Sequence, residues 1–89
     1  MRKIDLNFPI LDLEGKEVEK SNAGKIIANV LVNQSQGDAL KFWGWALELN
    51  KKEPIELDES DFSTLKDFIK NSEALPIITK AQVLRVFND

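Results

Sequence analysis

The chain contains no histidine, no cysteine and no tyrosine among its 89 residues. Histidine is the side chain whose ordinary pKa lies nearest neutrality, and it is the commonest metal ligand. Cysteine supplies thiolate nucleophiles, disulfides and most structural zinc sites. Catalysis would have to rest on Asp, Glu or Lys in strongly perturbed surroundings, which are hard to build in a body of this size. The sequence therefore predicts a protein that is not an enzyme and holds no cofactor and no metal.

Long apolar runs and an excess of basic charge are missing as well. No run approaches the roughly 18 apolar residues that cross a bilayer. The start, Met1 to Lys3, leads into an alternating pattern instead of a signal-peptide core. Twelve basic residues are scattered among fifteen acidic ones, whereas nucleic-acid binders gather basic residues on one face. We expect a cytoplasmic protein with no membrane partner, and nucleic acid is disfavoured as a partner.

What is present is typical of one folded domain over residues 1–89. The hydrophobic fraction is 43% and the charged fraction is 30%, which is ordinary for a folded chain and too apolar for disorder. A core of this size is marginal. Stabilisation by a second copy or by a partner protein is therefore plausible.

The N-terminal segment has the period of a strand. Residues 4–10 are apolar at every even position, which indicates one buried face. Pro9 has no N–H for a ladder, so an edge strand or a bulge is expected there. Gly15 closes a turn-forming stretch, and Val18 would point inward from a short return strand. We predict an N-terminal β-hairpin over residues 3–19.

Four later segments have the period of a helix. They are predicted at about residues 22–34, 38–50, 58–71 and 76–87. Asn22, Asp38 and Asp58 are of types that cap a helix N-terminus, and Pro76 suits a first helical position. The expected buried stripe of the last helix is Ile77, Ile78, Ala81, Leu84 and Phe87. The predicted fold class is α+β and mainly helical, with the hairpin packed with four short helices and a third short strand able to form at residues 55–57.

Two features that resemble functional motifs have simpler interpretations. The carboxylates cluster at Glu53, Glu56, Asp58, Glu59 and Asp61, without the spacing or central glycine of a calcium loop. Helix capping and solvation are their predicted roles. Gly24 precedes Lys25 outside any phosphate-binding motif, so we expect it to allow close packing in the first helical turn.

Aromatic residues concentrate in the second helical segment, at residues 42–45. Helical neighbours lie about 100° apart, so Trp43 and Trp45 cannot share a face. With Trp43 in the core, Trp45 would face outward. Both core packing and a protein interface remain open for it, because both use aromatic residues. The interface interpretation selects Phe42, Trp45 and Leu49, rimmed by Lys41 and Glu48.

Six short stretches form a further pattern. They are DLNF at 5–8, LDLEGK at 11–16, NAGK at 22–25, GDALKFW at 37–43, NSEAL at 71–75 and KAQ at 80–82. Together they resemble small proteins encoded in bacteriophage and prophage genomes, over nearly the whole chain. The motifs are structural and carry no signature of activity. The resemblance implies a bacterial host cytoplasm and a role in tail or head assembly.

The leading hypothesis is a non-enzymatic protein-interaction module, of the tail-assembly chaperone kind, that docks an apolar helix surface onto another protein or onto itself. The strand at residues 4–10 is a second candidate docking edge. The alternative is a small regulatory protein that acts on a host regulator. Action on DNA is weaker, because a helix-turn-helix in the last two helices would offer only Lys80, Gln82, Arg85 and Asn88.

Overall fold

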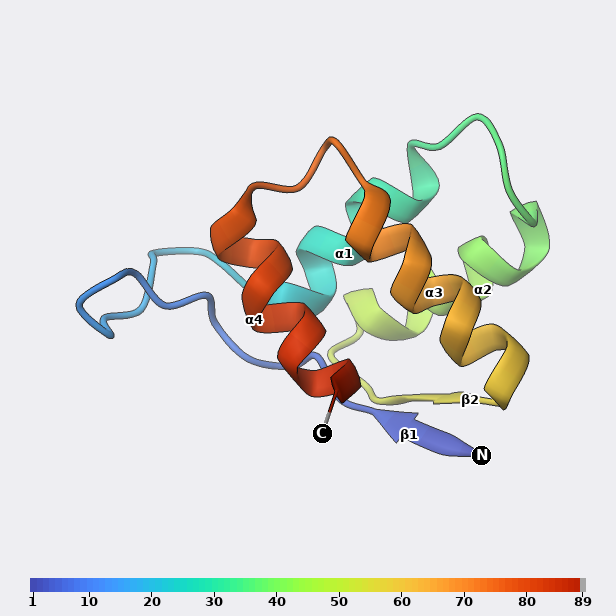
Figure 1. Cartoon of the computed structure of the whole chain (residues 1–89), viewed down its shortest axis with the longest axis horizontal. Helices are drawn as coiled ribbons and strands as arrows, with labels where there is room; N and C mark the ends of the chain where they lie inside the picture. Colours follow the sequence, from blue (N-terminus) through green and yellow to red (C-terminus); the bar gives the residue numbers. More distant parts are fainter. Residues whose placement is uncertain (89) are drawn as a thin grey trace.

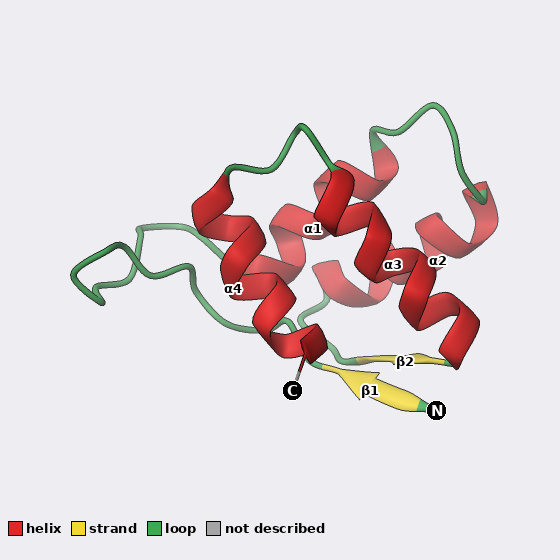
Figure 2. Cartoon of the chain, viewed as in Figure 1, coloured by secondary structure: helices red, strands yellow, loops and turns green. Residues whose placement is uncertain are grey.

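The structure is a computed structural model that describes residues 1–88. Its elements are β1 (Arg2–Ile4), α1 (Ala23–Val32), α2 (Ala39–Asn50), β2 (Ile55–Leu57), α3 (Glu59–Asn71) and α4 (Ile77–Asn88). Helices α3 and α4 lie in front of α1 and α2, and the two strands run along one side of this helical body (Figures 1 and 2). The mainly helical α+β class and the four helices are confirmed.

The sheet pairs strands from distant parts of the chain. β1 runs antiparallel to β2, with Ile4 opposite Ile55. The third strand predicted at residues 55–57 is therefore present and is the partner of the first. Its side chains at Ile55 and Leu57 are buried, so pairing with it extends the core.

The predicted hairpin over residues 3–19 is reduced to a turn. Gly15 adopts a φ of 83°, and one isolated antiparallel bridge joins Leu11 to Glu17. The described residues 16–19 form no strand, and Val18 is 42% exposed, so the expected inward position was wrong. The physical reason is that this segment has three charged residues around a single apolar one. It buries too little to compete with β2 for the first strand.

The alternating pattern of residues 4–10 does face the core. Ile4, Leu6 and Ile10 are buried. The backbone of this segment also completes the start of α1, because the Leu6 carbonyl accepts from the Gly24 N–H at 2.9 Å. A Cβ at Gly24 would lie 3.2 Å from the Leu49 carbonyl oxygen. The close packing expected at this glycine is confirmed.

Three helices begin at the capping residues that were predicted from the sequence. The side chains of Asn22, Asp38 and Asp58 each accept a hydrogen bond from the backbone N–H three residues later. Pro76 was predicted as the first helical residue, but it precedes α4, which begins at Ile77. The Pro76 carbonyl accepts the hydrogen bond from the Lys80 N–H. These caps satisfy N–H groups that would otherwise lack partners.

The expected buried stripe of α4 is confirmed at Phe87 and wrong at Ile77. The residues that α4 buries are Thr79, Val83 and Phe87, whereas Ile77 is 83% exposed. Apolar residues occur on two sides of this helix, so its pattern does not fix its rotation. Contact with α3 fixes it: the ring of Phe87 packs on that of Phe62 with centroids 5.3 Å apart.

Candidate interaction surface

The residues predicted to form the interaction surface lie in the core. Phe42, Trp45 and Leu49 are only 8%, 9% and 1% exposed. The ring of Phe42 stacks on Trp45 at 5.7 Å and meets Phe68 of α3 at 5.3 Å. The i, i+3, i+7 spacing was correct for a shared face, but that face is turned into the core. These three side chains are therefore not available for docking, and that prediction was wrong.

The two predicted rim residues behave differently from each other. Lys41 Nζ donates to Asp61 Oδ1 at 2.7 Å and so joins α2 to α3. This hydrogen bond and the charge of the Asp61 carboxylate raise the pKa of Lys41 above its ordinary value. Glu48 is exposed, and its backbone carbonyl accepts from the Glu53 N–H at the end of α2. Lys41 thus has a structural ion pair, and Glu48 lies beside a helix terminus.

The acidic cluster has the structural role expected of it, with added ion pairs. Asp58 Oδ1 caps α3 by accepting from the Asp61 N–H at 2.7 Å. Glu59 accepts from Arg2 Nε at 3.2 Å, and the Arg2 guanidinium lies 4.1 Å from the centre of the Phe62 ring. Within residues 1–88 there is no group of three acidic side chains that could hold a metal ion. Through Glu59 and Asp61, the cluster therefore links β1 and α2 to α3 by ion pairs.

Four large apolar side chains are exposed together on the opposite side of α2. Leu40, Trp43 and Leu47 are 86%, 56% and 43% exposed, and Val32 at the end of α1 is 42% exposed. Residues at i, i+3 and i+7 share one helical face. We call these four residues the apolar face. The sequence had indicated the wrong tryptophan, since Trp43 is outside and Trp45 is inside.

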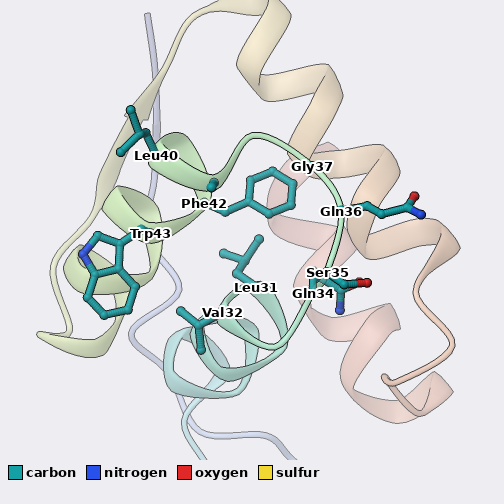
Figure 3. Close-up of a pocket in the computed structure, with 10 residues that line it drawn as sticks. Leu31, Val32, Gln34, Ser35, Gln36, Gly37, Leu40, Phe42 and Trp43 are labelled. Carbon is teal, nitrogen blue, oxygen red and sulfur yellow. The ribbon is translucent and has the colours of Figure 1, made fainter.

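The apolar face contains two adjoining hollows. One, of about 380 Å³, lies between the end of α1, the following loop and the start of α2. The other, of about 210 Å³, lies between the middle parts of α1 and α2. Val32 and Trp43 line both, and in Figure 3 Leu40 and Trp43 point outward from α2 while Phe42 turns under the loop. No charged side chain lines either hollow. We call the two hollows together the α1–α2 groove.

One glycine fixes the wall of the larger hollow. Gly37 has a φ of 113°, and a Cβ there would lie 2.7 Å from the ring of Phe42. Only glycine adopts this conformation without strain, and only glycine leaves room for the ring. The loop before α2 therefore lies directly on Phe42, as Figure 3 shows.

A second exposed apolar feature projects from the other end of the molecule. Residues 11–20, which we call the arm, extend beyond the helical body at one end of its long axis (Figure 1). Leu13 near its tip is 100% exposed. Leu11 at its base donates from N–H to Gln82 Oε1 at 2.9 Å and accepts from Gln82 Nε2 at 2.8 Å. Gln82, which sequence reasoning offered as a DNA contact, is thus occupied by the arm.

The base of the arm is closed by a second set of hydrogen bonds. Ser21 Oγ accepts from the Ile10 N–H at 3.0 Å and donates to the Val18 carbonyl at 2.6 Å. The Val18 N–H donates to the Ile10 carbonyl at 2.8 Å. These bonds and the Gln82 contact hold both ends of the arm while leaving its tip in solvent.

Comparison with family models, curated proteins and solved structures found no match. The resemblance to phage-encoded proteins therefore stays a prediction. Among residues 1–88, no helix has the length and apolar character needed to cross a membrane. The functional argument rests on the molecule's own surfaces.

Proposed function

We propose that this chain is a non-enzymatic protein-interaction module that docks through its apolar face, Val32, Leu40, Trp43 and Leu47. The observation that carries the proposal is the exposure of these four large side chains in one place. Single exposed apolar residues are ordinary on protein surfaces, whereas contiguous patches mark sites that bind other molecules. The face therefore favours a partner that covers it.

Covering the face supplies part of the energy that recognition requires. Burying a large apolar side chain contributes about 1.5–3 kcal/mol, and Leu40 and Trp43 have the most surface left to bury. The four residues together offer roughly 5 kcal/mol at about 25 cal/mol per Å². A micromolar complex requires about 8 kcal/mol. The face can supply the centre of such an interface, and contacts around its edge would supply the remainder.

For the biological setting we propose an assembly factor in the cytoplasm of a bacterial host, acting in phage tail or head assembly in the manner of a tail-assembly chaperone. Two features support this proposal. The stretches at residues 5–16 and 37–43 resemble those of phage and prophage proteins. An assembly chaperone also needs an exposed apolar site that binds another protein, which the apolar face provides.

The test is photo-crosslinking in producing cells. A photoreactive amino acid at position 40 replaces an 86% exposed leucine, so it should not disturb the core. The matched control carries the same group at Ser63, an exposed position of α3. We expect discrete adducts from position 40 that are absent from position 63 and are lost when Trp43→Asp is added.

Mass spectrometry of the adduct would separate the two biological settings. A virion structural protein, or a second copy of this chain, would support the assembly role, and a host regulator would support the regulatory alternative. No adduct from position 40, or the same adducts from both positions, would refute the docking role of the apolar face.

A further inference from the structure

We infer that two copies of this chain pair through α2, with the two helices antiparallel and crossing at Gly44. The inference rests on the proposed function and names the partner of the apolar face. It comes from a glycine on that face that the chain itself does not require. It comes also from an order of charges along α2 that is complementary to its own reverse.

Gly44 lies exposed in the interior of α2, on the same side of the helix as Leu40 and Leu47. After proline, glycine is the least favourable residue in a helix interior. A Cβ at Gly44 would meet no atom of the described residues within 4 Å, and the backbone there has no positive φ. The fold of the single chain therefore gives no reason for a glycine at this position. The close approach of a second backbone does give one.

The surroundings of Gly44 fit a helix. Leu40, Trp43 and Leu47 stand around it at helical spacings, and Figure 3 shows Leu40 and Trp43 pointing outward from α2. Packed helices interdigitate such rows of side chains, and their axes approach to about 8 Å where the residues at the contact are small. A row of apolar side chains with a gap at its centre is therefore a surface that a second helix covers.

The charges along α2 identify that helix as a second α2. Asp38 caps the start of α2, and Lys51 caps its end. Lys41 and Glu48 each stand three residues further in from these ends. The order from the start is acidic then basic, and the order from the end is basic then acidic. A copy that runs in the opposite direction therefore meets the opposite charge at all four positions, whereas a partner of uniform charge would not.

A two-fold axis at Gly44 fixes the register of the two helices. Each residue then lies at the level of the residue equally far on the other side of Gly44. Three pairs, with one residue from each copy, come within about 1.5 Å of the same level: Leu40 with Leu47, Asp38 with Lys51, and Lys41 with Glu48. Apolar side chains thus meet at the centre, and each end gathers two acidic and two basic residues. Lys52 and Glu53, which follow the helix, have opposite charges and leave this balance unchanged.

The bonds that these side chains make within the chain are compatible with the contact. Lys41 Nζ donates to Asp61 Oδ1 at 2.7 Å, and an ammonium group has three donors. Asp38 caps α2 through Oδ1, and a carboxylate has two oxygens that accept. Both side chains can therefore keep their structural bonds while they face a second copy.

The pairing closes at two copies. Both copies use the same surface, so the contact is isologous and leaves no free α2 for a third copy. Val32 of α1 lies beside Trp43 in the α1–α2 groove and widens the surface that the second copy covers. We therefore expect a dimer and no larger species.

The first test is light scattering after size-exclusion chromatography over a concentration series, with Gly44→Ala as the variant. Alanine favours the helix, so the urea midpoint of the dilute variant should rise. The added methyl group separates the two helices at their crossing, so the dissociation constant of the dimer should rise at least tenfold. Ser63→Ala on the exposed side of α3 is the matched control, and it should leave the dissociation constant unchanged.

The second test uses the absence of cysteine from the chain to report the direction of the helices. Leu40→Cys and Leu47→Cys are mixed in equal amounts, with one of them labelled with ¹⁵N, and are oxidised in a glutathione buffer. Antiparallel helices bring positions 40 and 47 of different copies within disulfide reach. Mass spectrometry should therefore find the mixed disulfide in at least tenfold excess over either self-disulfide.

We expect the wild type to approach twice the monomer mass of 10.1 kDa as its concentration rises, and to go no further. A wild type that is monomeric throughout, or that grows beyond a dimer, overturns the inference. A Gly44→Ala dimer as tight as that of the wild type overturns it too, as do self-disulfides that equal or exceed the mixed one. Capture of a different protein from position 40 would then leave the proposed function standing, whereas no adduct at all would remove both.

Discussion

Replacing each tryptophan of α2 in turn should have very different effects on stability. Trp45 is 9% exposed and stacks on Phe42 at 5.7 Å, so Trp45→Ala leaves a large cavity in the core. Truncation of a buried tryptophan costs about 3–5 kcal/mol. A domain of this size has a total stability of roughly 5–15 kcal/mol. We expect Trp45→Ala to be severely destabilised, or unfolded at ambient temperature.

Trp43→Ala should be mild by comparison. The side chain is 56% exposed, so less than half of its surface contributes to folding. At about 25 cal/mol per Å², the loss is roughly 1–2 kcal/mol. Trp45→Phe provides a graded control, because it keeps an aromatic ring against Phe42 and should cost less than Trp45→Ala.

The assay is urea unfolding followed by far-ultraviolet circular dichroism, at a protein concentration low enough to suppress association. Acrylamide quenching of the single-tryptophan variants Trp43→Phe and Trp45→Phe gives an independent reading of exposure. The remaining Trp43 should be quenched strongly and the remaining Trp45 weakly. Equal costs for the two alanine variants, or stronger quenching of Trp45, would refute the assignment of the two faces.

Three further perturbations follow from the backbone and from one ion pair. Gly37→Ala should lower the free energy of unfolding by roughly 2–4 kcal/mol, since it strains a φ of 113° and sets a Cβ 2.7 Å from Phe42; an unchanged urea midpoint would contradict this. Lys52→Gly should raise the free energy of unfolding by about 0.5 kcal/mol, because Lys52 follows the C-cap of α2 with a φ of 64°, where glycine is favoured, and a lower melting temperature would contradict the reasoning. The pKa of Lys41 is raised by its hydrogen bond to Asp61, so the pair stabilises the fold below pH 10.5 and is lost as pH rises through the folded-state pKa. NMR titration of Lys41 Nζ should show a lower midpoint in Asp61→Asn, and an identical midpoint would show that the carboxylate is not the cause.

Local signals in the sequence were sufficient to predict the positions of the helices. The caps Asn22, Asp38 and Asp58 act on backbone N–H groups three residues away, so their effect is readable without tertiary structure. The alternation in residues 4–10 likewise identified the buried face of the N-terminal segment. Four helices and a small sheet followed from these signals.

For two helices, the face that is buried could not be predicted from such local signals. α2 is apolar nearly all round, and α4 has apolar residues on two sides, so the pattern leaves their buried faces undetermined. Contacts with α3 decide them, through Phe68 for α2 and through Phe62 for α4. The selection of Trp45 for the surface and of Ile77 for the core failed for this one reason.

Partners that lie far apart in the chain were also missed. β1 pairs with β2 more than fifty residues later, and Gln82 reaches back to Leu11. Sequence separation hides such pairings, because no short-range spacing encodes them. A tight turn ending at Gly15 indicated a full hairpin, and only the complete fold shows that a buried strand competes for the same partner.

The most direct test of the account is an NMR titration of the isotope-labelled wild type with a soluble paramagnetic agent, at a protein concentration low enough to suppress association, with the two indole N–H signals as a matched pair. The account predicts strong broadening of the signal of Trp43, which is 56% exposed, and little broadening of the signal of Trp45, which is 9% exposed. Both tryptophans sit on the same helix, so the comparison separates the apolar face from the core within one sample. Equal broadening of the two indole signals, or stronger broadening of the Trp45 signal, would contradict the account.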